Sequence, residues 1–435
     1  MASKKKAKPV SVDSIIRSDE RASEFIRSLV SQRGRRIIKK KRPIGRIRSG
    51  IISLDYALGG GLPAGKITSF YGEKSGGKST TALRFVAAAQ SLCAVCLRRA
   101  EIREVVPDGS DEDARWRAVG YCDCVKSGMA EPPIPEKDPG MKAQEYSAMV
   151  RDLQEQLQEN SYQELVCLWI DVEDYFDEEW ASKLGVDVRR LELLAPESAE
   201  EAIDTVTMAL ESGAFGLVVL DSIAQLTPDK EYTATSEEWQ QGLAARLLNK
   251  AFRKWITGMR KAKDRFGNEH VPTLIMINQV RDKIGVMYGD PTTKPGGKGQ
   301  EFAASVELKF LSSKVEKEEE SFGSKTEGEK VDVPVREKIR FRVTKNRTSA
   351  TVGAEGFYVQ LNRGNDEFPA GYVMQDEFIM KMALKYVIQK KSGKYIAGDR
   401  EFASQVELLE AIRFDEEFRS ALVDTLLNVA KERKL

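Results

Sequence analysis

Apolar and polar positions along the chain predict a succession of strands and helices. Continuous or alternating apolar stretches are typical of buried strands, and they occupy residues 67–71, 165–170, 217–220 and 273–277. Helices are expected after and between these strands, at residues 80–90, 199–212 and 242–263. Strands that are apolar on both faces and separated by helices are typical of a mostly parallel, helix-covered sheet. The pattern therefore predicts an α/β fold.

Polar side chains follow three of these strands directly. Asp171 and Glu173 follow the second strand, Asp221 follows the third, and Gln279 lies just after the fourth. In an open α/β sheet, ligands bind outside the carboxyl ends of the strands. We therefore expect these side chains to meet at one ligand-binding edge.

The turn after the first strand has the spacing of a phosphate-binding loop. Residues 72–79 read Gly-Glu-Lys-Ser-Gly-Gly-Lys-Ser, which matches G-x-x-x-x-G-K-[ST]. The motif lies between a strand and a helix N-terminus, where backbone N–H groups and the helix dipole face an anion. Lys78 is expected to neutralise the β- and γ-phosphates, and the Ser79 hydroxyl to reach Mg²⁺. The expected nucleotide contacts are Gly72, Glu73, Lys74, Ser75, Gly76, Gly77, Lys78, Ser79 and Thr80.

The strand ends supply the other parts of a nucleotide hydrolase. Asp221 follows an apolar strand, as does the acid that holds Mg²⁺ directly or through water in such enzymes. Glu173 is a candidate general base, and Gln279 a candidate sensor of the γ-phosphate. A single strand-terminal acid is a weak signal, because acids also cap helices. Together with the loop they predict an enzyme that uses ATP and Mg²⁺.

Composition narrows the classes of partner. The chain has 435 residues, enough for about two or three domains, and a net charge of only +1. Any nucleic-acid surface must therefore be local. The single histidine, His270, excludes a histidine-rich metal site. No apolar run approaches the span of a bilayer and no signal peptide is recognisable, which predicts a cytoplasmic protein without a membrane partner.

The first 45 residues form a basic leader. A helical pattern covers residues 13–31, and residues 33–43 carry a dense run of arginine and lysine. Two interpretations stay open for residues 1–45. The leader is either a solvated tail or a polymerisation arm that docks on a neighbouring subunit or on DNA phosphates.

Four of the five cysteines lie in one segment, residues 92–162. They form two pairs, Cys93-x-x-Cys96 and Cys122-x-Cys124. In a cytosolic chain, two such pairs favour a structural Zn²⁺ site over disulfides, and four thiolates would leave no open position for catalysis. The alternative is four unrelated cysteines in a variable insertion. A helical stretch at residues 143–159 follows them.

The order and wording of these segments resemble the bacterial RecA strand-exchange recombinases. The resemblance covers residues 47–91 and 166–310, and its most specific stretches are residues 219–228, 242–246 and 277–289. It implies a RecA-like P-loop ATPase core at residues 46–366, an N-terminal arm, and a small α-rich C-terminal domain at residues 367–435. The insertion at residues 92–162 makes the chain a divergent member of the family, consistent with a phage-encoded protein.

The resemblance also implies roles within the nucleotide pocket. Glu173 matches the catalytic glutamate of the family, and Gln279 matches the glutamine that couples ATP to the DNA-binding loops. Trp180 falls where the family places an aromatic ring against adenine, and a tryptophan keeps that stacking face. Asp177 falls where an acid meets the edge of the base.

Other matched residues would act between subunits. Lys345 and Arg347 match a Lys-Asn-Lys element that reaches the neighbour's γ-phosphate, with arginine here in place of the second lysine. A solvated strand edge is the alternative interpretation of both. Phe302 matches an aromatic residue at the family's subunit interface.

DNA binding in the family uses two loops, whose counterparts are residues 229–241 and 282–300. Their backbone glycines, cations and aromatic ring suit phosphate contacts and base stacking. The DNA-contact candidates are Trp239, Arg246, Arg253, Arg281, Lys294, Gly296, Gly297 and Lys298. Residues 312–333, rich in charge, serine and glycine, predict either a solvated hairpin or disorder.

The resemblance implies an ATP-dependent recombinase that forms filaments on single-stranded DNA. It would bind single- and double-stranded DNA and copies of itself, and would catalyse homologous pairing and strand exchange. Two alternatives remain open from the residues. One is a hexameric helicase or repair-associated ATPase of the same fold. The other is a DNA-binding accessory protein that uses ATP only as a structural ligand.

Overall fold

The computed structural model divides into two units. Residues 1–43 form one unit, and residues 44–435 form the other. The structure describes residues 44–94, 97, 99–108, 115–122, 141–159, 164–228, 242–262, 272–282, 292–295, 299–322 and 329–432. The expected leader helix and basic run lie outside these residues. So do Cys96, Cys124, Trp239, Gly296, Gly297 and Lys298.

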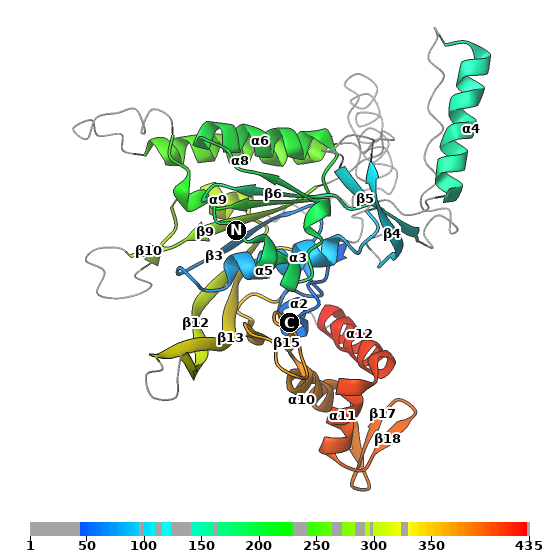
Figure 1. The fold of residues 1–435 in the computed structure, drawn as a ribbon, viewed down its shortest axis with the longest axis vertical. Helices are drawn as coiled ribbons and strands as arrows, with labels where there is room; N and C mark the ends of the chain where they lie inside the picture. The colour runs from blue at the N-terminus through cyan, green and yellow to red at the C-terminus, as the bar shows by residue number, and fades with distance from the viewer. Residues whose placement is uncertain are drawn as a thin grey trace, which may run out of the picture. The chain divides into compact units, whose positions relative to one another are not determined.

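Within the described residues the central sheet has nine strands, in the order β15-β14-β13-β12-β3-β9-β8-β6-β7 (Figure 1). From β12 to β7 all neighbours are parallel, whereas β12 to β15 pair antiparallel at one side. The strands are β3 (Ile67–Gly72), β6 (Cys167–Asp171), β7 (Leu191–Leu194), β8 (Leu217–Asp221), β9 (Thr273–Gln279), β12 (Val306–Phe322), β13 (Glu329–Asn346), β14 (Glu355–Leu361) and β15 (Val373–Met374). The prediction of an α/β fold with a mostly parallel sheet is confirmed.

Helices cover both faces of this sheet (Figure 1). They are α2 (Ile52–Ala57), α3 (Lys78–Ala89), α5 (Glu178–Lys183), α6 (Ala199–Ser212), α8 (Leu243–Lys261) and α9 (Gly299–Ala303). Alternate strand residues point to opposite faces. Trp169 and Val219 accordingly belong to the core beneath α3. Leu168 and Val218 belong to a second core beneath α6 and α8. This is why the strands are apolar without interruption.

Short elements complete the core. They are β1 (Arg46–Ile47), β2 (Leu62–Pro63), the 3₁₀ turns η1 (Val188–Arg190) and η2 (Ile223–Gln225), β10 (Arg281–Asp282) and β11 (Thr292–Thr293). Antiparallel pairing of β10 with β11 brings the start of the second expected DNA loop next to residues 292–293 within that loop.

The insertion contains a hairpin and a helix. The hairpin pairs β4 (Glu101–Asp108) with β5 (Arg115–Tyr121), and α4 (Ala143–Glu159) has the predicted bounds. Cys93 and Cys122 lie with Ala100 and Ala118 in one small apolar cluster at the base of the hairpin. The hairpin also contacts the core through the Arg189 guanidinium, which lies 5.2 Å from the centroid of the Trp116 ring.

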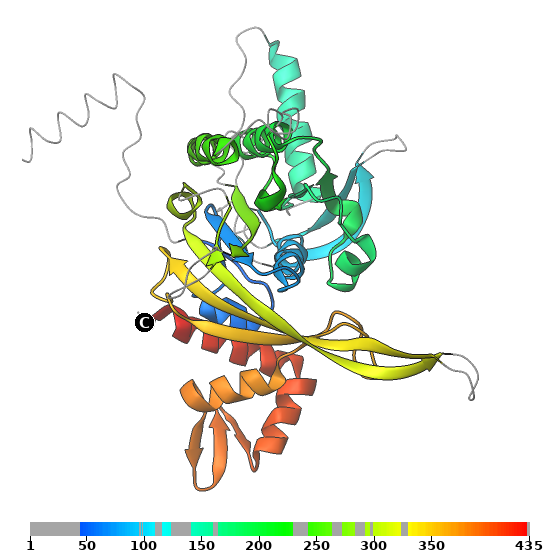
Figure 2. The ribbon, with the colours of Figure 1, turned by 90° about the vertical axis from the view of Figure 1, so that its left-hand side faces the viewer.

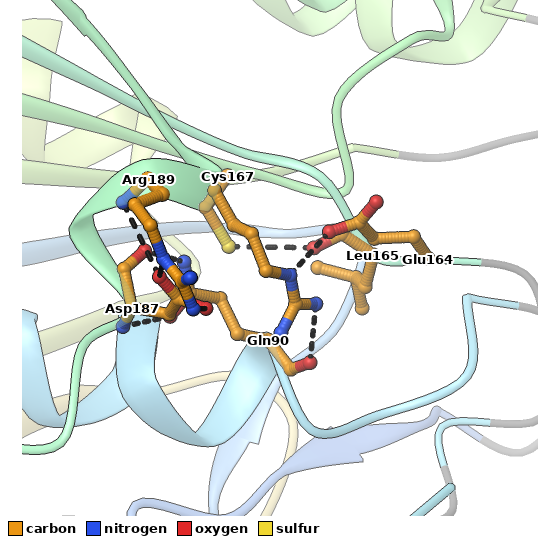
Figure 3. A network of polar contacts seen from close by, with 7 residues as sticks. Gln90, Glu164, Leu165, Cys167, Asp187 and Arg189 are labelled. Atoms are coloured by element: carbon orange, nitrogen blue, oxygen red, sulfur yellow. Dashed lines mark hydrogen bonds and ion pairs between the residues drawn. The ribbon is translucent and has the colours of Figure 1, made fainter. Parts of the chain in front are cut away.

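Figure 3 shows the polar network where the insertion returns to the core. The buried Arg190 guanidinium donates to Glu164 Oε1 at 2.8 Å and to the Gln90 carbonyl at 2.8 Å. The Gln90 amide in turn exchanges two hydrogen bonds of 2.9 Å with the backbone of Asp187. Glu164 also forms a β-bridge with Cys93, so the network holds the two ends of the insertion together.

Replacing Arg190 by methionine is expected to lower the free energy of unfolding by about 3–5 kcal/mol, because the largely buried Glu164 carboxylate would lose a close counter-charge. Urea denaturation followed by circular dichroism measures this change. Arg189→Met is the control, since the Arg189–Asp187 pair is half exposed and should contribute less than about 1 kcal/mol. Equal losses in the two variants would contradict the assignment.

Strands β12 and β13 continue beyond the sheet as a two-stranded ribbon (Figure 2). β12 pairs with β3 only as far as Phe310, yet it pairs with β13 as far as Phe322 and Glu329. Cross-strand ion pairs such as Lys317–Asp332 and Arg336–Glu316 lie along the ribbon. The hairpin interpretation of residues 312–333 is therefore confirmed over its described part, and the disorder alternative is wrong there.

The C-terminal segment builds its own apolar cluster. It comprises α10 (Asp376–Tyr386), the three-stranded sheet β16 (Gln389–Lys391), β17 (Lys394–Ala397) and β18 (Arg400–Phe402), then α11 (Gln405–Phe414) and α12 (Glu416–Glu432). Ile52 of α2 joins this cluster. In the described part of the chain, no helix combines the length and the apolar character needed to cross a membrane.

Candidate nucleotide site

The phosphate loop connects β3 to α3 as the sequence predicted, and two of its glycines are sterically required. Gly72 has φ +155°, and a Cβ there would lie 2.2 Å from the Phe310 carbonyl oxygen. Gly77 precedes α3 with φ +83°, and its Cβ would lie 2.7 Å from Ile339 Cδ1. Larger residues at either position would displace the loop from the neighbouring strands β12 and β13.

Lys78, the first residue of α3, is buried against the loop. Its ammonium donates to the Glu73 carbonyl. Burial lowers the pKa of Lys78, while the carboxylates of Asp221, Glu173 and Glu73 oppose that shift. A cation held in this way faces the position where the loop would receive phosphate oxygens.

Ser79 and Asp221 form a pair of oxygen donors at the sheet edge. The Ser79 hydroxyl donates to Asp221 Oδ2 at 2.6 Å. Burial raises the pKa of Asp221 to about 6, with repulsion from Glu173 and Asp171 adding to the shift, whereas Ser79 and Lys78 oppose it. Hydroxyl and carboxylate oxygens are ligands that Mg²⁺ prefers. A cation bound here would favour the ionised carboxylate, so the donor set fits Mg²⁺.

Glu173 receives two side-chain hydrogen bonds on one oxygen. Ser222 Oγ donates to Glu173 Oε1 at 2.5 Å, and Gln279 Nε2 donates to the same atom at 3.0 Å. The carboxyl ends of β6, β8 and β9 therefore meet at one edge of the sheet, as expected. Ser222 was not singled out from the sequence as a partner of Glu173, because the two residues are far apart in the chain.

Asp171 is a second residue that the sequence analysis left without a role. Its carboxylate accepts hydrogen bonds from the backbone N–H groups of Glu173 at 3.1 Å and of Tyr175 and Phe176 at 2.8 Å each. The buried acid thereby shapes the turn that presents Glu173. An aspartate that ends a strand two residues before a candidate base is the available signal.

One cavity of about 250 Å³ lies among these groups, and its lining includes Lys78, Ser79, Asp171, Glu173, Asp177, Trp180, Asp221 and Gln279. Asp177 Oδ1 caps α5 by accepting the Trp180 N–H at 2.8 Å, which leaves its other oxygen for a ligand. The half-buried Trp180 and the exposed Tyr175 border the same cavity. The structure therefore brings together residues expected to contact the phosphates, Mg²⁺ and the adenine ring.

The expected intersubunit residues lie together elsewhere. The Lys345 ammonium donates to the Glu301 carbonyl, and Arg347 donates to the Phe302 carbonyl at 3.3 Å. Burial and the adjacent Arg347 lower the pKa of Lys345. Phe302 is 71% exposed. None of Lys345, Arg347 and Phe302 lines the cavity of its own chain.

The described DNA-contact candidates differ in their surroundings. Arg246 and Arg253 are exposed on α8. Arg281 lies in β10, at the start of the second loop. Lys294, by contrast, is largely buried and pairs with Glu307 at 3.0 Å. The remaining candidates lie outside the described residues.

The cysteines are only partly placed. Cys93 and Cys122 are buried in the same cluster, whereas Cys96 and Cys124 are not described. Over the described ranges, no group of three or more histidine, cysteine, aspartate or glutamate side chains is arranged to hold a metal ion. Cys167, in β6, lies in the main core.

A protein-family model described as the RecA N-terminal domain matches residues 24–100 and 148–356. The chain belongs to the RecA family. The unmatched stretch between the two segments falls within the predicted insertion at residues 92–162, so the family match continues on both sides of it.

Curated RecA proteins agree with this membership. RecA of Chloroherpeton thalassium is 33% identical over 263 residues, which are 60% of this chain and 52% of that protein. RecA of Tropheryma whipplei is 28% identical over 395 residues, covering 89% of this chain and 68% of the relative. RecA of Mycobacterium ulcerans is 29% identical over 366 residues, covering 84% and 77%. This chain thus spans about half the length of the Chloroherpeton thalassium RecA.

Among solved structures, a crystal structure of the RadB recombinase is 15% identical to this chain, with a TM-score of 0.39. The match covers 72% of this chain and 94% of RadB. That score is too low to establish a shared fold.

Proposed function

We propose that this RecA-family chain is an ATP-dependent recombinase that assembles on single-stranded DNA and catalyses homologous pairing and strand exchange. The observation that carries the proposal is the contact of Gln279 with Glu173 beside the Ser79–Asp221 pair. Gln279 ends β9, and β10 follows it at the start of the second expected DNA loop. One side chain therefore links the hydrolytic base to the segment that would contact DNA.

ATP hydrolysis would use the residues of the cavity directly. The phosphate loop and Lys78 would hold the phosphates, and Ser79 and Asp221 would hold Mg²⁺, which would neutralise phosphate charge. Glu173 accepts a proton from the attacking water, and the Ser222 and Gln279 hydrogen bonds fix the orientation of its carboxylate. Asp177 and Trp180 would bind the adenine base of ATP.

The subunit arrangement of the family supports a shared site. Lys345 and Arg347 would contact the γ-phosphate held by the neighbouring subunit, and the exposed Phe302 would pack at the same interface. A heterologous interface of this kind generates an open helical filament when its rotation does not close. The leader at residues 1–45 would serve as the polymerisation arm, and the segment at residues 367–435 as the C-terminal domain.

DNA would run along α8, with its exposed arginines, and along the second loop. Arg246 and Arg253 would contact phosphates, as would Arg281 and Lys298, while Trp239 would stack on bases. Gly296 and Gly297 would let backbone N–H groups approach the DNA.

Electron microscopy with single-stranded DNA and a non-hydrolysable ATP analogue tests the assembly. The proposal expects extended helical filaments whose length follows the length of the DNA. Closed rings would instead support a hexameric helicase. Tight ATP binding without turnover in a phosphate-release assay would support the accessory-protein alternative.

A structural Zn²⁺ bound by Cys93, Cys96, Cys122 and Cys124 remains a proposal for the insertion. Its support is the placement of Cys93 and Cys122 in one cluster. We expect about one equivalent of zinc per chain in elemental analysis of the purified protein. Cys122→Ser should abolish zinc binding, whereas the control Cys167→Ser, in the main core, should retain it. Protein without stoichiometric zinc would contradict the assignment.

A further inference from the structure

Lys294 is buried against a carboxylate instead of facing solvent. Its ammonium lies 3.0 Å from Glu307 Oε2, and their side chains are only 15% and 7% exposed. The same ammonium lies 4.0 Å from the centroid of the Tyr71 ring, a cation–π distance. Glu301 Oε1, more exposed, lies 3.8 Å away on another side.

The position of Glu307 explains why this pair should persist. Glu307 lies in β12, between Ser69 of β3 and Lys345 of β13 in the strand register. Its Oε1 is buried and accepts no hydrogen bond from any described residue. If Lys294 moved to a DNA phosphate, the buried carboxylate would lose its close cation, which is strongly unfavourable. The geometry therefore opposes a direct DNA contact by Lys294.

The residues that Lys294 touches adjoin both parts of the ATP chemistry. Tyr71 directly precedes Gly72, the first residue of the phosphate loop, and its hydroxyl donates to Thr344 Oγ1 at 3.0 Å. Thr344 Oγ1 also donates to the Glu307 carbonyl at 3.3 Å. Lys345, the residue after Thr344, lies directly across from Glu307. Through its contacts with Tyr71 and Glu307, the Lys294 ammonium is therefore linked both to the phosphate loop and to β13, the strand that carries Lys345.

Lys294 also belongs to the segment that closes the second DNA loop. The next residue, Pro295, accepts a hydrogen bond on its carbonyl from Asn278 Nδ2 at 3.0 Å. Asn278 is buried and immediately precedes Gln279. A displacement of residues 294–295 would therefore reach the nucleotide site by two routes, through Asn278 and through the Lys294 side chain.

We propose that Lys294 is a positioning residue that couples the second DNA-facing segment to ATP turnover through Glu307 and Tyr71, and that it is not a DNA phosphate contact. The inference rests on the proposed function, because it requires DNA-stimulated ATP hydrolysis. Lys294 would provide a second connection besides the Gln279–Glu173 contact. This connection would affect both β3, which leads into the phosphate loop, and Lys345 of β13.

The test compares Lys294→Met, Lys294→Arg and Glu307→Gln with the wild type in two assays. Phosphate release at saturating oligo-dT gives kcat and the KM for ATP. Fluorescence anisotropy of labelled oligo-dT across a salt series gives the affinity and its salt dependence. Lys381→Met, which removes an exposed cation from α10, controls for net charge.

For Lys294→Met we expect kcat to fall about fivefold to tenfold while the KM for ATP changes less than about twofold. Lys294→Arg should restore most of kcat, because it keeps the ion pair. The double variant Lys294→Met/Glu307→Gln should be no worse than the poorer single variant, since both disrupt one interaction. Affinity for oligo-dT and its salt slope should stay at the wild-type values.

An unchanged kcat in Lys294→Met would overturn the inference. A salt slope reduced by about 0.7, the share of one single-strand phosphate contact, would also overturn it and assign Lys294 to DNA. Failure of the proposed function is a separate result, because wild-type protein would then show no stimulation by oligo-dT at all.

Discussion

Glu173→Gln is expected to lower ATP turnover by about 10²–10⁴-fold, the usual contribution of a positioned general base. The substitution keeps the shape of the side chain and an oxygen that can accept the Ser222 and Gln279 hydrogen bonds. It removes the carboxylate that would accept the proton of the attacking water. ATP affinity should be retained, because the phosphate loop and Lys78 are untouched.

Phosphate release at saturating ATP and single-stranded DNA measures this loss, and equilibrium binding of a fluorescent ATP analogue checks the retained affinity. Asp174→Asn is the matched control, because Asp174 is an adjacent exposed acid that does not line the cavity. Turnover within a few-fold of wild type in Glu173→Gln would remove Glu173 from the role of base.

Arg347→Ala is expected to reduce turnover by about 10³-fold or more, the scale of a transition-state arginine. Arg347 lies beside Phe302 and away from the cavity of its own chain. The arginine should therefore act on the neighbouring subunit. Arg342→Met removes an exposed cation of β13, the strand that ends just before Arg347, where Arg342 pairs with Glu355. This control should leave turnover near the wild-type value.

Mixing two inactive variants separates action on the neighbour from action within one chain. Lys78→Ala lacks a working loop, and Arg347→Ala lacks the arginine. In an equimolar mixed filament, about one quarter of heterologous interfaces would pair an intact loop with an intact arginine. Turnover should therefore recover to about that share of wild type. No recovery, with mixed filaments demonstrated, would contradict a shared site.

Much of the fold could be predicted because its physical causes are local. Strands such as β8 and β9 are apolar on both faces, since helices cover both sides of the sheet, and their bounds follow from that run of apolar residues. The phosphate loop was recognisable from its glycine and lysine spacing between a strand and a helix, and the structure shows a local reason for two of the glycines. A Cβ at Gly72 would clash with the Phe310 carbonyl, and Gly77 has φ +83°. The insertion helix α4 could also be placed from its sequence pattern.

Long-range pairings set the limit of that prediction. The charged sequence of the β12–β13 ribbon predicted either a solvated hairpin or disorder, because the pairing depends on cross-strand partners such as Lys317 and Asp332. Lys294 resembled a DNA contact because of its loop, whereas its surroundings are set by Tyr71 and Glu307 from two other strands. A loop sequence alone does not carry that information.

In the proposed function, DNA controls ATP hydrolysis by this chain. The most direct measurement is phosphate release by the wild-type protein with and without single-stranded DNA, followed by transfer of a homologous strand from a labelled duplex under the same conditions. We expect turnover that depends on single-stranded DNA and strand transfer that requires both ATP and homology. Equal turnover with and without DNA, or strand transfer without ATP, would contradict the proposed function.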